Sequence, residues 1–229
     1  MEKIGFIGVY DKTDLLINIA KILTMLDKKV LLIDSTITQK AKYIVPTITP
    51  TTSYVTSFEE IDVAVGFRNL TQIKEYLGVE ELAYDIALID VDTPKEMEEY
   101  ELTNARKNFF VTSFDVYSLK KGLEILSGLN QNLNLIKVLF SIEMLREEEE
   151  YLDFLASDYK IIWSDYKIYF QMENGDLSAM MENQRTQRIK FKKLSAQYKD
   201  GLLVIVQQIL ENASEGSIRR IIKNIEKGV

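Results

Sequence analysis

The segment from residue 3 to residue 23 constrains the fold more than any other part of the chain, because it reads as a strand, a turn and a helix. The apolar run at residues 4–7 is typical of a buried strand, and apolar residues recur at helical spacing from Leu15 to Leu23. The turn between them ends in Lys12 and Thr13. A phosphate-binding loop has a lysine and a hydroxyl at this point, where backbone N–H groups and the helix dipole hold the anion.

This turn lacks most of the glycines that a phosphate-binding loop uses. Gly8 is present, but Val9 is β-branched and Asp11 puts a carboxylate where the anion should bind. On these residues alone, an ordinary turn between a strand and a helix explains the segment as well as a phosphate-binding loop does.

Composition limits the classes of function. The 229 residues are 46% hydrophobic, which is enough for one large core, and no apolar run has membrane-spanning length. The chain has no cysteine and no histidine, so thiol catalysis, a Ser-His-Asp hydrolase, a zinc site and a haem site are excluded. Any metal would be a hard cation held by carboxylates, hydroxyls and phosphate. The net charge of −7 disfavours bulk binding of nucleic acid, and a cytoplasmic location is expected.

Strand and helix patterns alternate along the chain. We expect further strands at residues 30–34, 61–65, 84–90, 109–112, 135–140 and 160–163, and helices at 70–77, 116–126 and 190–210. Residues 41–58 are predicted to be a surface excursion, and residues 143–150 a solvated, charged helix face. This order predicts a single α/β domain with a doubly wound, mostly parallel sheet.

In such a sheet, ligands bind beyond the carboxyl ends of the strands. Asp90, at the end of an apolar strand, suits a ligand of Mg²⁺ or its water, and Asp34 could orient a second water. The alternative is that these acids only cap strand ends. The polar residues predicted at this edge are Lys12, Thr13, Asp34, Asp90, Asp92, Thr112, Ser113, Ser141 and Asp165.

The order and spacing of these pieces resemble the ParA/MinD family of deviant-Walker ATPases, which have the P-loop NTPase fold, over nearly the whole chain. The family has a strand leading into Lys-Gly-Gly-x-x-Lys-Thr, then Lys-Lys-Val-Leu-Leu-Ile-Asp, Tyr-Asp-x-x-x-x-Asp and Val-Thr-x-x-x-x-x-Ser-Leu. Residues 7–13, 28–34, 84–90 and 111–119 match these segments here. The second and third segments match well, and the loop matches poorly.

The resemblance implies a site for ATP or ADP with Mg²⁺. Its nucleotide-binding residues would be Gly8, Lys12, Thr13, Asp34 and Asp90, and its Mg²⁺ ligands would be Thr13 and Asp90. Two family positions differ. The signature lysine falls on Ile7, and the acid that places the attacking water falls on Thr36. Because each such electrostatic group contributes several kcal/mol to lowering the barrier, the resemblance implies a weak ATPase or none, and no catalytic residue is assigned.

The C-terminal residues 212–229 read as a linker and a basic amphipathic helix after a domain of residues 1–211, with Ser217 as the expected N-cap. This helix suits an anionic membrane surface, and it is similar to the membrane-targeting helix of MinD-type proteins. The alternative is that its isoleucines pack on the protein's own core or on a partner. The residues predicted to contact a membrane are Ile218, Arg219, Arg220, Ile221, Ile222, Lys223 and Ile225.

A second basic cluster precedes the expected helix at 190–210. A solvated helix face explains it better than nonspecific contact with DNA phosphates, which the resemblance to ParA-like proteins would imply. The cluster consists of Arg185, Arg188, Lys190, Lys192 and Lys193.

Three functional interpretations follow from the resemblance. The first is a positioning or assembly protein with a degenerate nucleotide site, which recruits protein partners of a pilus, secretion or partition complex on a membrane or on DNA. Its location would be cytoplasmic, with peripheral attachment to the inner face of the membrane. The second is an active but slow ATPase that cycles through a homodimer. The third is an interaction scaffold that binds no nucleotide.

Overall fold

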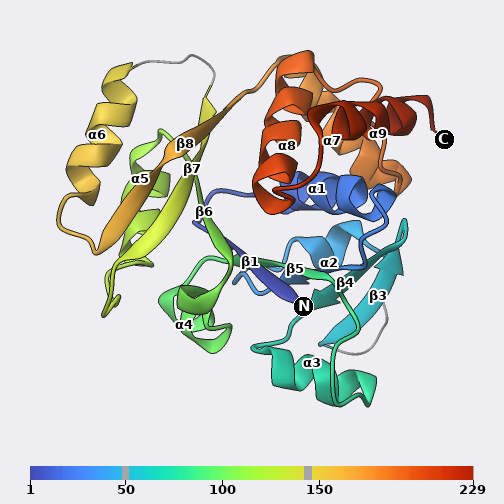
Figure 1. Cartoon of the computed structure of the whole chain (residues 1–229), viewed down its shortest axis with the longest axis horizontal. Helices are drawn as coiled ribbons and strands as arrows, with labels where there is room; N and C mark the ends of the chain where they lie inside the picture. The colour runs from blue at the N-terminus through green and yellow to red at the C-terminus, as the bar shows by residue number, and fades with distance from the viewer. Residues whose placement is uncertain (48–51, 142–145, 229) are drawn as a thin grey trace.

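The computed structural model describes residues 1–47, 52–141 and 146–228, and its centre is one eight-stranded sheet (Figure 1). The strand order is β3-β4-β2-β5-β1-β6-β7-β8. All neighbouring pairs are parallel except β3 and β4. The strands are β1 (Glu2–Ile7), β2 (Val30–Asp34), β3 (Tyr54–Phe58), β4 (Ile61–Val65), β5 (Ile86–Val91), β6 (Lys107–Ser113), β7 (Leu133–Ser141) and β8 (Ile161–Gln171).

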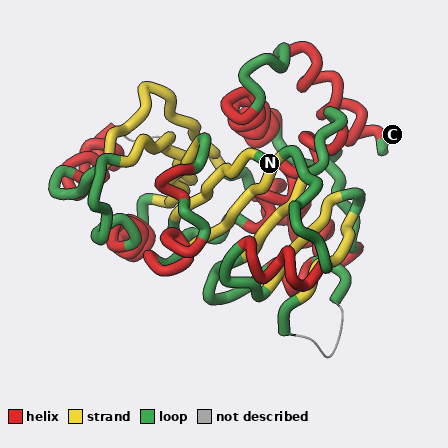
Figure 2. Tube along the Cα trace, turned by 60° about the horizontal axis from the view of Figure 1, so that its bottom comes forward, coloured by secondary structure: helices red, strands yellow, loops and turns green. Residues whose placement is uncertain are grey.

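Helices cover both faces of the sheet, as Figures 1 and 2 show. One apolar core joins the sheet to α1, α2, α7, α8 and α9, and the other joins it to α3, α4, α5 and α6. The helices are α1 (Thr13–Met25), α2 (Ala41–Ile44), α3 (Leu70–Leu77), α4 (Pro94–Glu99), α5 (Val116–Glu124), α6 (Arg146–Ala156), α7 (Asn174–Thr186), α8 (Ala196–Ile209) and α9 (Glu215–Lys227), and one 3₁₀ turn covers Leu102–Asn104.

The doubly wound, mostly parallel sheet predicted from the sequence is confirmed. Residues 30–34, a continuous apolar run ending in Asp34, form β2, and all five are buried because helices cover both faces. The predicted strand at 61–65 and helix at 70–77 match β4 and α3.

The prediction that residues 41–58 are a surface excursion is wrong for its described parts. Residues 41–44 form α2, and residues 54–58 form the edge strand β3, which pairs with β4 through a two-residue turn at Glu59 and Glu60. Both turn residues have positive φ, 52° and 69°. Two-residue hairpin turns of this kind usually use Asn or Gly, so the two glutamates carry no turn signal. Residues 48–51 lie outside the described residues.

The predicted strand at 160–163 is too short. β8 continues to Gln171 through an irregularity in its register opposite Leu135 and Lys137 of β7. Asp165 therefore lies inside the strand and not at its carboxyl end, so its prediction as a site residue is wrong. Both faces of β8 are partly exposed before Ile168, which hides the pattern of a buried strand.

The prediction of a long helix at 190–210 is also wrong in its first part. Residues 174–186 already form α7, and α8 begins only at Ala196. The buried carboxylate of Asp176 accepts hydrogen bonds from the backbone N–H and the hydroxyl of Ser195, at 2.6 and 2.9 Å. Ser195 in turn caps α8 by accepting a bond from the Tyr198 N–H. These bonds fix a non-helical connection where the sequence pattern predicts a helix.

The prediction that residues 143–150 form a solvated helix face is wrong at Glu149. Residues 142–145 lie outside the described residues. The Glu149 side chain is 14% exposed and accepts hydrogen bonds from Lys137, Lys167 and the Tyr169 hydroxyl. Burial alone would raise its pKa, but the bonds from Lys167, Tyr169 and Lys137 outweigh burial and lower the pKa to about 2. Glu149 thus fastens α6 to the sheet.

The C-terminal residues fold as α9 against the rest of the protein. Ser214, and not the predicted Ser217, is its N-cap. The four isoleucines of its apolar stripe are 0 to 8% exposed and belong to the core shared with α1 and α8. A membrane-facing role for them would therefore require α9 to detach. In the part of the chain that the structure describes, no helix is long and apolar enough to cross a membrane.

Candidate functional site

The carboxyl ends of β1, β2 and β5 bring the predicted site residues together. Asp34 of β2 lies beside Asp90 of β5, and β1 runs on the other side of β5. At the end of β1, Gly8 has a φ of +144°, and a Cβ there would lie 2.1 Å from the backbone oxygen of Val111. Only glycine fits this close approach of the loop to β6. The structure thus gives Gly8 a role in backbone packing.

Lys12 is turned inward and not toward solvent. Its Nζ lies 2.6 Å from Asp90 Oδ1 and donates a 2.6 Å hydrogen bond to the backbone oxygen of Gly8. The residue is only 2% exposed. Burial raises the pKa of Asp90 from 3.8 to about 7; the Lys12 ammonium lowers it in part, and the neighbouring Asp34 carboxylate raises it further. The lysine and the acid therefore form a buried pair in which burial disfavours the charged form of the acid and the lysine favours it.

The first donors of α1 are occupied by the protein's own carboxylate. Asp11 Oδ1 accepts hydrogen bonds from the backbone N–H of Thr13 at 3.1 Å and from its hydroxyl at 2.9 Å. The other oxygen of Asp11 forms an ion pair with Lys40. Burial alone would raise the pKa of Asp11, but the contacts with Lys40 and Thr13 outweigh it and lower the pKa. Asp11 therefore takes the position at the helix N-terminus that suits an anion.

Asp34 is engaged in holding the segment that follows β2. Its Oδ1 accepts hydrogen bonds from the Thr36 N–H and hydroxyl, at 3.1 and 2.7 Å, and its Oδ2 accepts one from the Ala41 N–H at 2.9 Å. Asp92 accepts bonds from the Ile37 N–H to both its carboxylate oxygens. Two carboxylates thus fix the backbone of residues 36–41.

Two large apolar side chains project from or beside this fixed segment. Ile37 is 76% exposed and Tyr43, in α2, is 79% exposed. Thr36, which stands at the family's acid position, has its hydroxyl bonded to Asp34. The segment therefore presents apolar side chains to solvent at the edge where the strands end.

The other predicted residues at this edge serve local structure. Thr112 is fully buried, and its hydroxyl donates to the Ser113 backbone oxygen at 2.8 Å. Ser113 bonds Asp115, which caps α5. Ser141 ends β7, while Asp165 lies elsewhere, as described above. Within the described residues, no group of three or more Asp, Glu, His or Cys is placed to hold a metal ion.

The sequence did not reveal two residues that shape the loop. Lys40 meets Asp11 from 29 positions along the chain, and no local pattern signals such a pair. Tyr10 stacks on Phe140 of β7, with ring centroids 4.8 Å apart, which fixes the middle of the loop. The presence of an aromatic residue inside the loop was the sequence signal that could have indicated the contact of Tyr10 with Phe140.

Comparison with solved structures shows the ParA/MinD fold. The chain is similar to MinD in the MinC:MinD cell division protein complex of Aquifex aeolicus, with a TM-score of 0.60 and 14% identity over 93% of this chain and 98% of that one. It is similar to a ParA family ATPase from Chlorobium tepidum TLS, with a TM-score of 0.55 and 14% identity over 98% of this chain and 97% of that one. A third similar structure is a complex of Cyanothece McdA with ATP, with a TM-score of 0.56 and 12% identity over 93% of this chain and 98% of that one.

Sequence comparison adds nothing to these structural matches. No protein-family model matches the chain, and no curated protein matches it. The structural similarity, at 12 to 14% identity, therefore concerns the fold.

Proposed function

We propose that this chain, which has the ParA/MinD fold, recruits protein partners to a membrane-associated or DNA-associated complex without hydrolysing ATP. The observation that carries the proposal is the position of Asp11. Its carboxylate accepts the N–H and hydroxyl of Thr13, the groups that a phosphate and Mg²⁺ would need. In this arrangement the loop residues do not fit a magnesium nucleotide.

The position of Lys12 supports the same conclusion. To reach a phosphate, its ammonium would have to leave both Asp90 and the Gly8 backbone oxygen. That movement would leave the buried Asp90 carboxylate without its cation, which is costly in a low-dielectric interior. The family's signature lysine position, held here by Ile7, is fully buried in the core, so no second cation is supplied there.

In a recruiting protein, the exposed surfaces determine which partner binds. The proposed partners belong to a pilus, secretion or partition complex. The MinC:MinD cell division protein complex among the similar structures supports a protein partner in general. Since the isoleucines of α9 are packed, we propose that peripheral contact with the inner membrane face uses its exposed cations. These are Arg219, Arg220, Lys223 and Lys227.

A slow ATPase with a dimerisation cycle is the second candidate, because Lys12, Thr13 and Asp90 all remain next to one another. Calorimetry with ATP and ADP in the presence of Mg²⁺, with turnover recorded on the same samples, separates the two. The recruiting proposal expects no binding to the wild-type protein at millimolar nucleotide. Micromolar binding that Lys12→Ala abolishes would refute it, and measurable turnover in those samples would establish the ATPase.

The variant Asp11→Gly tests directly whether the Asp11 carboxylate blocks the site. Removal of the carboxylate frees the Thr13 donors, so nucleotide binding should become measurable at millimolar concentration. Asp27→Gly is the matched control. It makes the same change at the other end of α1, where Asp27 has a φ of +58°, and should leave nucleotide binding undetected. Equal behaviour of the two variants would show that Asp11 does not block the site.

A further inference from the structure

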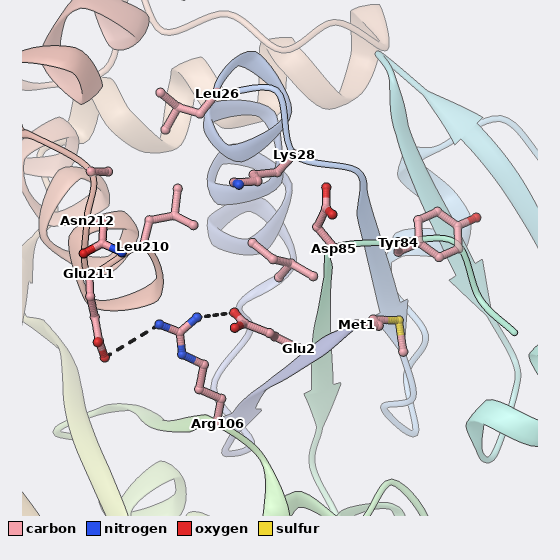
Figure 3. Close-up of a pocket in the computed structure, with 12 residues that line it drawn as sticks. Met1, Glu2, Leu26, Lys28, Tyr84, Asp85, Arg106, Leu210, Glu211 and Asn212 are labelled. Atoms are coloured by element: carbon pink, nitrogen blue, oxygen red, sulfur yellow. Dashed lines mark hydrogen bonds and ion pairs between the residues drawn. The ribbon is translucent and has the colours of Figure 1, made fainter.

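A groove lies at the amino ends of the parallel strands, where β1 and β5 begin, on the side of the sheet opposite to the carboxyl ends described above. Its volume is about 590 Å³, within the range of small-molecule sites. As Figure 3 shows, its walls come from the end of α1, the segment before β5 and the segment after α8. Apolar side chains form much of its lining, among them Leu26, Ile86 and Leu210. The groove is separate from the loop that holds Lys12.

Most charged and polar side chains around the groove already have partners. Arg106 forms ion pairs with Glu2 and, at 3.7 Å, with Glu211 (Figure 3). Lys107 adds a second cation to Glu211 at 3.2 Å. The Asp85 carboxylate accepts the Lys29 N–H at 2.8 Å. Glu2 and Glu211 are thus paired with cations, whereas Asp85 has a backbone donor at one oxygen and keeps its charge.

Lys28 is different. Its side chain is half-buried, has no partner among the described residues and points into the groove (Figure 3). The Asn212 side chain, which lies across the groove, is likewise without a partner in the described part of the chain. The Lys28 side chain lies beside apolar side chains of the groove, and no carboxylate of the described residues forms an ion pair with its ammonium. An anionic ligand group would.

We infer that this groove binds a small apolar carboxylate, of the kind of a medium-chain fatty acid. The carboxylate would meet the Lys28 ammonium, and the hydrocarbon chain would cover the partly exposed Leu26 and Leu210. A peptide with a free carboxyl end fits less well, because its amide groups need several unpaired polar partners and the lining offers few. The inference goes beyond the proposed function and does not depend on it.

Calorimetry with decanoate, below its micellar concentration, tests the inference on the full chain. Saturable one-to-one binding is expected. Lys28→Gln should weaken it about tenfold or more, since the variant loses the charge-assisted hydrogen bond to the ligand carboxylate. Lys29→Gln is the matched control, because the adjacent Lys29 is exposed and does not line the groove. It should leave the affinity unchanged.

Two further probes complete the test. Decylammonium, with the same chain and the opposite charge, should not bind. An acetylated Leu-Leu peptide with a free carboxylate should bind more weakly than decanoate. Equal affinity of wild type and Lys28→Gln, binding of decylammonium as tight as that of decanoate, tighter binding of the peptide, or no saturable binding would each overturn the inference. Thermal unfolding of both variants verifies that they are folded.

Discussion

The Lys12 ammonium and the Asp90 carboxylate lie 2.6 Å apart, with side chains that are only 2% and 4% exposed. A buried pair of this kind costs much when one partner is removed, because the other charge stays buried alone. We expect Lys12→Met to lower the free energy of unfolding by about 3–5 kcal/mol, measured by urea denaturation. The double variant Lys12→Met/Asp90→Leu should recover much of the loss. A double variant as unstable as the sum of the single ones would contradict this interpretation.

The pH dependence of stability should report on Asp90. Burial raises its pKa from 3.8 to about 7, so the folded state binds more protons at this group than the unfolded state between about pH 4 and pH 7. The contribution of Asp90 therefore falls as the pH rises through this range. Relative to Asp90→Asn, the wild type should lose stability between pH 5 and pH 7 in urea titrations. A constant difference between the two proteins would be inconsistent with the raised pKa.

The turn between β3 and β4 should be open to stabilisation. Glu60 has a φ of +69°, which glycine adopts at no steric cost. Glu60→Gly is expected to raise the free energy of unfolding by about 0.5–1 kcal/mol, visible as a higher melting temperature. Glu60→Ala is the control, since it loses the same ion pair with Lys21 but keeps a Cβ. An equal gain in both variants would show that backbone strain is not the cause.

The two glycines Gly8 and Gly216 should respond in opposite ways to alanine. A Cβ at Gly8 would meet the Val111 backbone oxygen at 2.1 Å, so Gly8→Ala should destabilise by about 3 kcal/mol or more. Gly216 lies in the first turns of α9 with nothing within 4 Å, so Gly216→Ala should stabilise by about 0.5–1 kcal/mol. Thermal or urea unfolding measures both. Tolerance of Gly8→Ala would mean that the loop can move away from β6.

The packing of α9 predicts a contrast between neighbouring residues. Ile222 is 6% exposed, so Ile222→Ala should cost about 2–4 kcal/mol of unfolding free energy, whereas the exposed Lys223→Ala should change it by less than about 0.5 kcal/mol. Sedimentation with anionic liposomes adds a second readout. If binding occurs through charges alone, Lys223→Ala and added salt should weaken it. Binding of the wild type that resists salt would indicate that the isoleucines insert.

The sequence predicted the sheet because burial on both faces leaves a simple pattern. In β2 every residue is buried, so an unbroken apolar run ending in Asp34 was sufficient. In β8 the pattern fails, because residues before Ile168 are partly exposed on both faces and the register is irregular. Helix α7 was missed because its buried face consists only of Asp176, Ala179 and Met180, while its other apolar residues, Leu177 and Met181, are 50% and 66% exposed, so no apolar stripe of helical spacing stands out.

The sequence predicted which residues gather at the candidate site, but not what their side chains contact. Lys12, Thr13, Asp34 and Asp90 do gather at one edge of the sheet, as parallel strands require. What each side chain contacts was not predictable, since the Asp11–Lys40 pair and the inward turn of Lys12 depend on distances between segments far apart in the chain. The sequence shows which groups meet at an edge, and packing decides which of them remain free.

The carboxylates of Asp34 and Asp92 have a consequence for recognition. They accept hydrogen bonds from Thr36, Ile37 and Ala41, and so they immobilise the backbone beside Ile37 before any other molecule arrives. A protein that captured Ile37 or Tyr43 would therefore lose little chain entropy on binding, and contact area would convert into affinity more fully than on a mobile loop. Asp34 and Asp92 thus act here by preorganising the exposed segment that follows β2.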